Sequence, residues 1–181
     1  MKLSFQLNTE SINNLIKSLK LIDDKIDKIT ELALKDLAER GITYIKEYLS
    51  IYGLGNSSIA DNLQLVKIEN GYQLIATGKQ LDGGLCQAVL VEFGTGIKGS
   101  ENPHALAGES NYVYDINNHG YAGWWYPTDE NDKNSTKYVT QDGAILAHTK
   151  GLPSRPFMYS TQAKLETEMA EVLRKYLKAV I

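Results

Sequence analysis

The sequence predicts a single α+β domain over residues 1–181, in which a small antiparallel sheet packs against two long helices. Two amphipathic runs, one ending near residue 50 and one beginning near residue 156, predict the helices. An Asn-Gly dipeptide at Asn70 predicts a hairpin between them. The composition, with 43% hydrophobic and 23% charged residues, is typical of a globular chain of this length, which can bury one core without a disulfide.

The N-terminal half is predicted to be mainly helical. Residues 2–7 alternate between apolar and polar side chains, which predicts a short strand. Thr9 is a suitable cap for a first helix, and the acidic pair at 23–24 predicts the start of a second helix that continues to about Ser50. Two small residues on the apolar face of this long helix would let a sheet or another helix approach closely: Ala33 and Gly41.

The segment after the long helix is predicted to contain three strands. Residues 52–57 break the helix, and a capping box beginning at Ser58 predicts one short helical turn. Strands at 63–69 and 72–77 flank the Asn-Gly turn and form the hairpin. The mostly apolar run at 88–93 predicts a central strand that is covered on both faces.

Residues from about 94 to 150 are predicted to form a long irregular loop, because the segment is rich in Gly, Asn, Asp and Tyr and has no helical period. Short strands are expected within it at 123–126 and 137–139. A loop this long inside a compact domain is usually functional. The final helix is expected to begin after residues 154–156, with glutamates preceding the basic residues so that the charges match the helix dipole.

The charge pattern argues against several function classes. The formal net charge is −3, from 22 acidic and 19 basic residues spread along the chain. We therefore expect no specific nucleic-acid binding, which needs clustered Lys and Arg. Cys86 is the only cysteine, which excludes an intrachain disulfide. We expect neither a signal peptide nor a membrane span, because polar residues interrupt every apolar run.

Candidate chemistry is sparse. Three histidines lie in or beside the long loop at spacings of 15 and 29 residues, which no zinc motif uses: His104, His119 and His148. We expect ordinary surface histidines, and no metal, cofactor or catalytic residue. Cys86 could act as a nucleophile only with one of these histidines as its base. The interpretation that we favour for Cys86 is a small buried residue at a strand edge.

Three aromatic residues lie side by side in this polar region: Trp124, Trp125 and Tyr126. A strand presents alternate side chains to opposite faces, so the three cannot all be buried on one face. Either one face packs on the domain and the other is left for a partner, or the loop folds over its own core. Aromatic residues are enriched among interface anchors, and we therefore predict a subunit contact here.

Three segments together resemble one known family. They are residues 91–96 (VEFGTG), 120–126 (GYAGWWY) and 149–159 (TKGLPSRPFMY), and the order of the predicted elements around them matches as well. The chain is similar along nearly its whole length to the minor neck or tail-completion family of tailed bacteriophages, the head-tail joining proteins. It departs from the family pattern at residues 52–63, where related chains have a Pro-x-x-Thr-Gly-x-Leu turn.

The resemblance implies a non-enzymatic structural protein of the virion, located at the head-tail junction and made and assembled in the cytoplasm of the bacterial host. It implies a homo-oligomeric ring of about six or twelve copies that contacts the phage connector or adaptor and the tail proteins. DNA would pass through this ring, and neither a cofactor nor a membrane is implied. A tail-terminator ring is the alternative, followed by a hydrolase that uses Cys86 or the loop histidines.

The motifs also contain one pair of opposite charges. An Arg–carboxylate pair is planar and directional enough to lock two elements together, so we expect Glu92 and Arg155 to pair within a subunit or across neighbours. In that case Glu92→Arg would block ring assembly, and Arg155→Glu would partly restore it. The predicted subunit interface takes residues from all three motifs: Glu92, Phe93, Thr95, Trp124, Trp125, Tyr126, Arg155 and Phe157.

Overall fold

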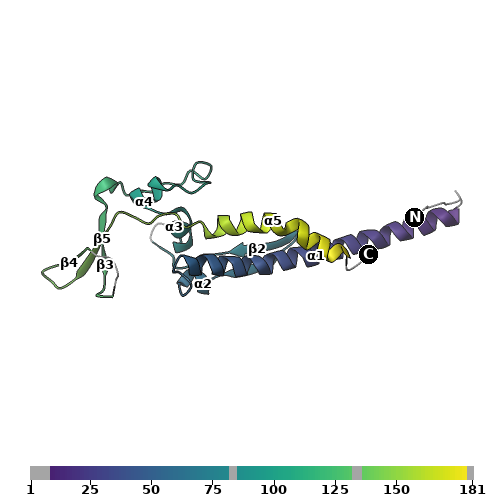
Figure 1. Ribbon diagram of the computed structural model, residues 1–181, viewed down its shortest axis with the longest axis horizontal. Coiled ribbons are helices and arrows are strands. Elements are labelled where there is room, and N and C mark those ends of the chain that lie inside the picture. The colour runs from purple at the N-terminus through teal and green to yellow at the C-terminus, as the bar shows by residue number, and fades with distance from the viewer. Residues whose placement is uncertain (1–8, 82–84, 132–135, 179–181) are drawn as a thin grey trace.

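One long helix organises the molecule. The computed structural model describes residues 9–81, 85–131 and 136–178, and the predicted strand at 2–7 lies outside these ranges. Helix α1 (Thr9–Ile51) has 43 residues and is about 64 Å long (Figure 1). The predicted division into two helices at the acidic pair 23–24 is wrong, because α1 continues through it. Two aspartates cost only about 1 kcal/mol of helix propensity, whereas the apolar spacing of three and four residues passes through this point without a break.

The C-terminal helix α5 (Phe157–Lys178) is confirmed and runs antiparallel to the second half of α1 (Figure 1). The two helices share a buried cluster made of Ala33, Leu37 and Val172. The role predicted for the small residues is confirmed at Gly41, where an added methyl group would lie 2.6 Å from Leu74 Cδ2 and 3.2 Å from Leu165 Cδ1. Glycine at this position lets both β2 and α5 reach α1.

The predicted hairpin is also confirmed. Strands β1 (Gln64–Ile68) and β2 (Gly71–Ile75) pair antiparallel, with Ile68 opposite Gly71. Strand β2 packs on α1, while every residue of β1 is exposed. The hairpin therefore covers α1 with one strand and presents the other to solvent.

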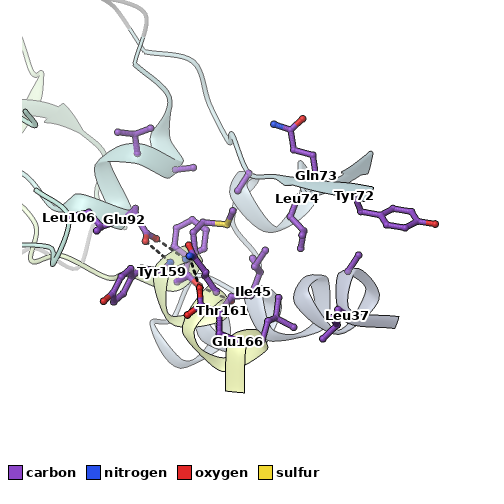
Figure 2. Close-up of a pocket in the computed structure, with 18 of the residues that line it drawn as sticks. Leu37, Ile45, Tyr72, Gln73, Leu74, Glu92, Leu106, Tyr159, Thr161 and Glu166 are labelled. Atoms are coloured by element: carbon purple, nitrogen blue, oxygen red, sulfur yellow. Dashed lines mark hydrogen bonds between the residues drawn. The ribbon is translucent and has the colours of Figure 1, made fainter. Parts of the chain in front are cut away.

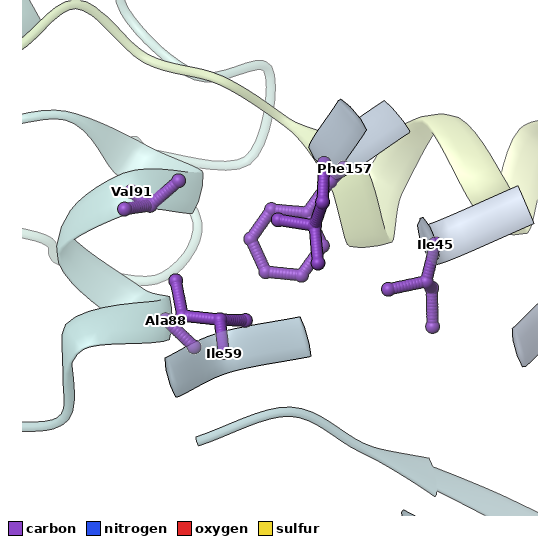
Figure 3. Packing of buried hydrophobic residues seen from close by; sticks show 6 residues of the cluster. Ile45, Ile59, Ala88, Val91 and Phe157 are labelled. Carbon is purple, nitrogen blue, oxygen red and sulfur yellow. The ribbon is translucent and has the colours of Figure 1, made fainter. Parts of the chain in front are cut away.

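A second buried cluster lies where α1 ends. Its members come from α1, α5, the short helix α2 (Ser58–Asp61) and helix α3 (Gln87–Phe93), as Figure 3 shows. They are Ile45, Leu49, Ile59, Ala88, Val91 and Phe157. The predicted central strand at 88–93 is wrong, since α3 occupies these residues. A short apolar run does not distinguish a strand from a buried helix, and the buried residues of α3 fall at the helical spacing of Ala88, Val91 and Glu92.

Two local predictions near this cluster change as well. The cap of α2 is Ser57, whose Oγ accepts the Ala60 N–H at 3.5 Å, and not Ser58, which donates to Gln87 Oε1. Cys86 was expected to be a small buried residue at a strand edge. It is half-buried against the cluster, pairs with Gln80 in an isolated β-bridge and immediately precedes α3.

The region between α3 and α5 is an arm that carries its own small sheet. It contains helix α4 (Gly96–Glu101), a 3-10 turn η1 (Gly120–Ala122) and strands β3 (Trp124–Thr128), β4 (Lys137–Val139) and β5 (Ile145–Thr149). The strand order is β3-β5-β4, and both pairings are antiparallel. The two predicted strands are confirmed as β3 and β4. Strand β5, which lies between them in the sheet, was not predicted. Figure 1 places this sheet at the end of the molecule opposite the N-terminus of α1.

The chain exposes far more surface than a compact protein of its mass. Its accessible surface is 12804 Å². A compact monomer of 20.1 kDa would expose roughly 8,700 Å². The excess comes from the free N-terminal part of α1 and from the arm, both visible in Figure 1. Among the described residues, no helix is both long and apolar enough to cross a membrane.

A polar cluster joins the exposed sides of α1 and α5. The Asp36 carboxylate accepts hydrogen bonds from Lys175 Nζ at 2.8 Å, Arg40 Nε at 2.9 Å and Tyr176 Oη at 3.2 Å. Arg40 Nη1 also donates to Glu168 Oε2 at 3.0 Å. Hydrogen bonds from Lys175 and Arg40 lower the pKa of Asp36 from 3.8 to about 2.

Replacing Asp36 by Asn should lower the free energy of unfolding by about 1 kcal/mol at pH 7, because the cluster is partly solvated and screened. The folded-state pKa of Asp36 lies below its ordinary value, so the stabilisation is complete above about pH 4 and is lost as the pH falls through about 2. Urea midpoints at pH 7, 4 and 2 test this, with Glu39→Gln as the control because the Lys35–Glu39 pair is long and exposed. Equal midpoints for Asp36→Asn and the unsubstituted chain at pH 7 would contradict it.

Candidate functional site

The three motifs that carry the family resemblance meet at one junction, where the arm leaves the helical body. The backbones of Thr95 and Leu152 exchange two hydrogen bonds, from Thr95 N to Leu152 O at 2.8 Å and from Leu152 N to Thr95 O at 3.1 Å. The Arg155 N–H donates to Val91 O at 2.9 Å, and Ser154 Oγ donates to the Glu92 carbonyl at 2.7 Å. The VEFGTG and RPFMY segments are therefore two sides of one backbone pairing.

Glycines make this close approach possible. Gly94 has φ +83°, and an added methyl group would lie 2.6 Å from Ser154 N and 2.7 Å from Leu152 O. Gly151 has φ +102°, and a methyl group there would collide with the Thr95 carbonyl. On the third motif, a methyl group at Gly123 would collide with Thr149 O. Only residues without a Cβ can occupy these positions, since both the backbone angle and the space exclude a side chain.

Glu92 is the polar centre of the junction, and it does not pair with Arg155 within the described chain. Its Oε2 accepts the Met158 N–H at 2.9 Å, and its Oε1 accepts the Tyr159 N–H at 2.9 Å and His104 Nε2 at 3.1 Å (Figure 2). The expected Glu92–Arg155 pair is therefore wrong within the subunit. With 7% of its surface exposed, Glu92 serves the N-terminus of α5, where a negative charge meets unsatisfied N–H groups and the positive end of the helix dipole.

His104 completes this cluster and is not the surface histidine that was expected. It is buried, and its Nδ1 accepts the Leu106 N–H at 3.0 Å, so Nε2 carries the proton that is donated to Glu92. The rings of Phe93 and Tyr159 lie 4.4 Å and 5.3 Å from its own ring. Because both ring nitrogens are engaged, His104 has no nitrogen left to act as a general base.

Tyrosines hold the rest of the arm to the junction. Tyr112 Oη donates to Gly94 O at 2.8 Å, and its ring stacks on Phe93 at 4.6 Å. Burial raises the pKa of Tyr112 to about 12. Tyr114 Oη accepts the His104 N–H at 2.9 Å. Sequence reasoning missed this pair, although the alternate spacing of the two tyrosines was a visible signal.

The distal sheet presents an aromatic face to solvent. Trp125 is 48% exposed, and its ring lies 6.3 Å from Tyr138 and 5.0 Å from His148. Its neighbour Trp124 turns to the other face and stacks on His119 at 4.5 Å. The first of the two interpretations of the aromatic run is therefore the one that the geometry favours, with one face packed and one face open. Tyr138, 56% exposed, belongs to the open face and was not among the predicted residues.

The predicted interface residues fall into three settings. Glu92 and Phe157 are buried inside the subunit and serve its fold. Trp125 is exposed on the distal sheet. The others are half-buried, at the junction or on the packed face of the sheet: Phe93, Thr95, Trp124, Tyr126 and Arg155. The subunit contact itself stays a prediction.

The described part of the chain contains no group of three His, Cys, Asp or Glu side chains placed to hold a metal ion. His119 Nδ1 lies 3.0 Å from Asp115 Oδ1, and Asp115 also accepts the Gly120 N–H, which holds the pKa of this carboxyl below its usual value. His148 Nε2 lies 2.8 Å from Ala122 O. These histidines tie the arm together.

No protein-family model, no curated protein and no solved structure matches the chain. The resemblance to the tail-completion family stays a prediction that rests on the three motifs and on the order of the elements around them.

Replacing Glu92 by Gln should lower the free energy of unfolding by about 3 kcal/mol, because the buried junction loses a charge and one of its two acceptor oxygens. Guanidinium midpoints measure this, with Glu171→Gln on the exposed side of α5 as the control. Since the Glu92 carboxylate binds α5 and not Arg155, Arg155→Glu should not rescue Glu92→Arg. A Glu92→Gln midpoint equal to that of Glu171→Gln would count against the proposed cap.

Gly94 and Gly143 form a matched pair for testing the junction. Both have φ +83°, but nothing lies within 4 Å of a methyl group added at Gly143. Gly143→Ala should cost about 1 kcal/mol through the backbone angle alone. Gly94→Ala should cost at least about 3 kcal/mol, because its methyl group also meets backbone atoms that cannot move aside. Urea unfolding of both variants measures the difference, and equal costs would show that the close approach is unimportant.

Proposed function

We propose that the chain is a structural subunit of a tailed bacteriophage, one copy in a homo-oligomeric ring at the head-tail junction. The observation that carries this proposal is the meeting of the three family motifs at one junction. Three residues from two of these motifs, Glu92, Gly94 and Gly151, have a common physical task there, which is to fix the arm to the helical body. Three motifs that take part in one contact support the resemblance better than three motifs that lie apart would.

The shape of the molecule also supports a role in assembly. A chain with 12804 Å² of accessible surface exposes roughly half as much again as a compact monomer of its mass. Elongated arms and an open aromatic face are typical of subunits that bury these surfaces against neighbours. An oligomer with the connector on one side and the tail on the other would cover them.

The proposal gives the titratable groups structural roles. Both nitrogens of the buried His104 are engaged, and Cys86 packs half-buried against the core. The net charge of −3 suits a ring that DNA passes through without being held, because clustered positive charge would bind the phosphate backbone.

Disruption of the gene in the phage that encodes this chain tests the proposal. The expected result is DNA-filled heads and separate tails that do not join, seen by electron microscopy of the lysate. Joined, infectious particles formed without the chain would refute the proposed function.

Complementation with variants tests the aromatic face. Trp125→Ser should lower the yield of joined particles at least tenfold, because exposed Trp residues at interfaces are often worth about 2 kcal/mol or more. Ile51→Ser is the matched control, since Ile51 is 74% exposed at the end of α1 and apart from the distal sheet. Equal yields from both variants would move the contact away from this face.

A further inference from the structure

The N-terminal part of α1 carries an apolar stripe that the described chain does not cover. Apolar residues recur at steps of three and four at positions 12, 15, 19, 22, 26, 29 and 33. The stripe is buried where α5 and the hairpin lie on it, with Ile29 5% and Ala33 1% exposed. Further toward the N-terminus, Ile12 is 46% and Ile26 51% exposed. Residues 12–26, called the α1 extension below, thus continue an interface that is already formed within the subunit.

The same chain also has an apolar trough on its helical body. A trough of about 720 Å³ lies between β2 and α5, with α1 as its floor and α3 at one end. Figure 2 shows side chains of these elements turned toward this common space. Its apolar lining includes Leu34, Leu37, Leu74, Met158, Leu165 and Met169. Leu34 and Met169 at its rim are 36% and 45% exposed.

We propose that the α1 extension of one copy lies in the apolar trough of a second copy. The lengths agree, because the stripe from Ile12 to Ile26 is about 21 Å long and the trough floor from Leu34 to Ile45 is about 17 Å long. An amphipathic helix with apolar residues at spacings of three, four and seven is what a hydrophobic groove accepts. One contact would cover both of the uncovered apolar surfaces.

This contact joins two different surfaces of the same chain, so it is heterologous. Each copy offers its extension to the next and receives the extension of the one before, and such head-to-tail contacts generate rings or helical filaments. The subunit has enough surface for such a contact, since its total accessible surface of 12804 Å² exceeds that of a compact monomer of its mass by several times the roughly 800 Å² per partner that a stable interface buries.

A competing arrangement pairs two α1 extensions with each other, because a strict three-and-four spacing is also that of a coiled coil. That arrangement would leave the trough uncovered. Cross-linking distinguishes the two arrangements in the isolated full-length chain. Cys86→Ala removes the native thiol, one preparation then carries Ile16→Cys on the extension, and the other carries Met169→Cys at the trough rim; both positions are exposed.

We expect a bis-maleimide to link the mixed preparations into a heterodimer and to link neither preparation efficiently alone. Efficient linking of Ile16→Cys chains to each other, with none in the mixture beyond this, would overturn the proposal in favour of helix pairing. No cross-link at the highest soluble concentration would overturn it as well.

Sedimentation equilibrium supplies a second measurement. Ile12→Ser with Ile26→Ser should raise the dissociation constant of self-association at least a hundredfold, because two buried isoleucines are lost. Lys17→Ser with Lys28→Ser, on the polar side of the same helix, is the matched control and should change it less than threefold. Circular dichroism should find both pairs folded like the parent chain, and equal dissociation constants for the two pairs would contradict the proposal.

The inference does not require a phage particle. Head-to-tail association of the isolated chain stands even if the virion lacks this protein. Conversely, a chain that joins heads to tails through other surfaces would leave the proposed function intact and this contact refuted.

Discussion

The structure depends on one carboxylate. Glu92 lies in α3, and its carboxylate accepts hydrogen bonds from the N–H groups of Met158 and Tyr159 at the start of α5. His104 of the arm donates to the same carboxylate. Three segments far apart in the sequence are thereby fixed to one side chain. Because that side chain is buried, its charge is balanced only by the dipole of α5 and by these hydrogen-bond donors, and removal of one donor weakens that balance.

The backbone that follows Glu92 adds a second set of contacts between the same segments. Thr95 and Leu152 pair through their main chains, and the glycines beside them permit an approach that no side chain could allow. One contact therefore includes the Glu of α3, the glycines with positive φ and the Arg-Pro-Phe start of α5. The co-occurrence of these motifs in one sequence has a physical cause, whatever the protein assembles with.

Much of the fold could be predicted from local signals. The Asn-Gly turn, the small Gly41 on the packed face and the C-terminal helix all followed from short-range rules. The errors lie where a local signal is ambiguous or is overridden. The apolar run at 88–93 is compatible with either a strand or a buried helix. The helix forms because it lets Ala88 and Val91 pack together in the core cluster. The acidic pair at 23–24 resembles a helix start, yet the longer apolar period overrides it.

The candidate site was harder to predict, because its partners are set by contacts over long sequence separations. Opposite charges at Glu92 and Arg155 suggested a pair, but the nearer donors are backbone N–H groups, which no sequence pattern displays. The expectation of a surface histidine is wrong at His104 because the rings that surround it, those of Phe93 and Tyr159, lie far from it in the sequence. Strand alternation requires one of the two adjacent tryptophans to face outward but does not say which one, and the structure shows that it is Trp125.

The main-chain pairing of Thr95 with Leu152 has a consequence for how such a protein can vary. Hydrogen bonds between peptide groups do not depend on side-chain identity. Substitutions further along the arm therefore leave unchanged the angle at which the arm leaves the helical body. Residues of the arm that contact neither Glu92 nor this pairing, such as the exposed residues of β4, can be exchanged to suit a different neighbour while the base of the arm keeps its direction. A scaffold of this kind separates the part that sets geometry from the part that adapts to partners.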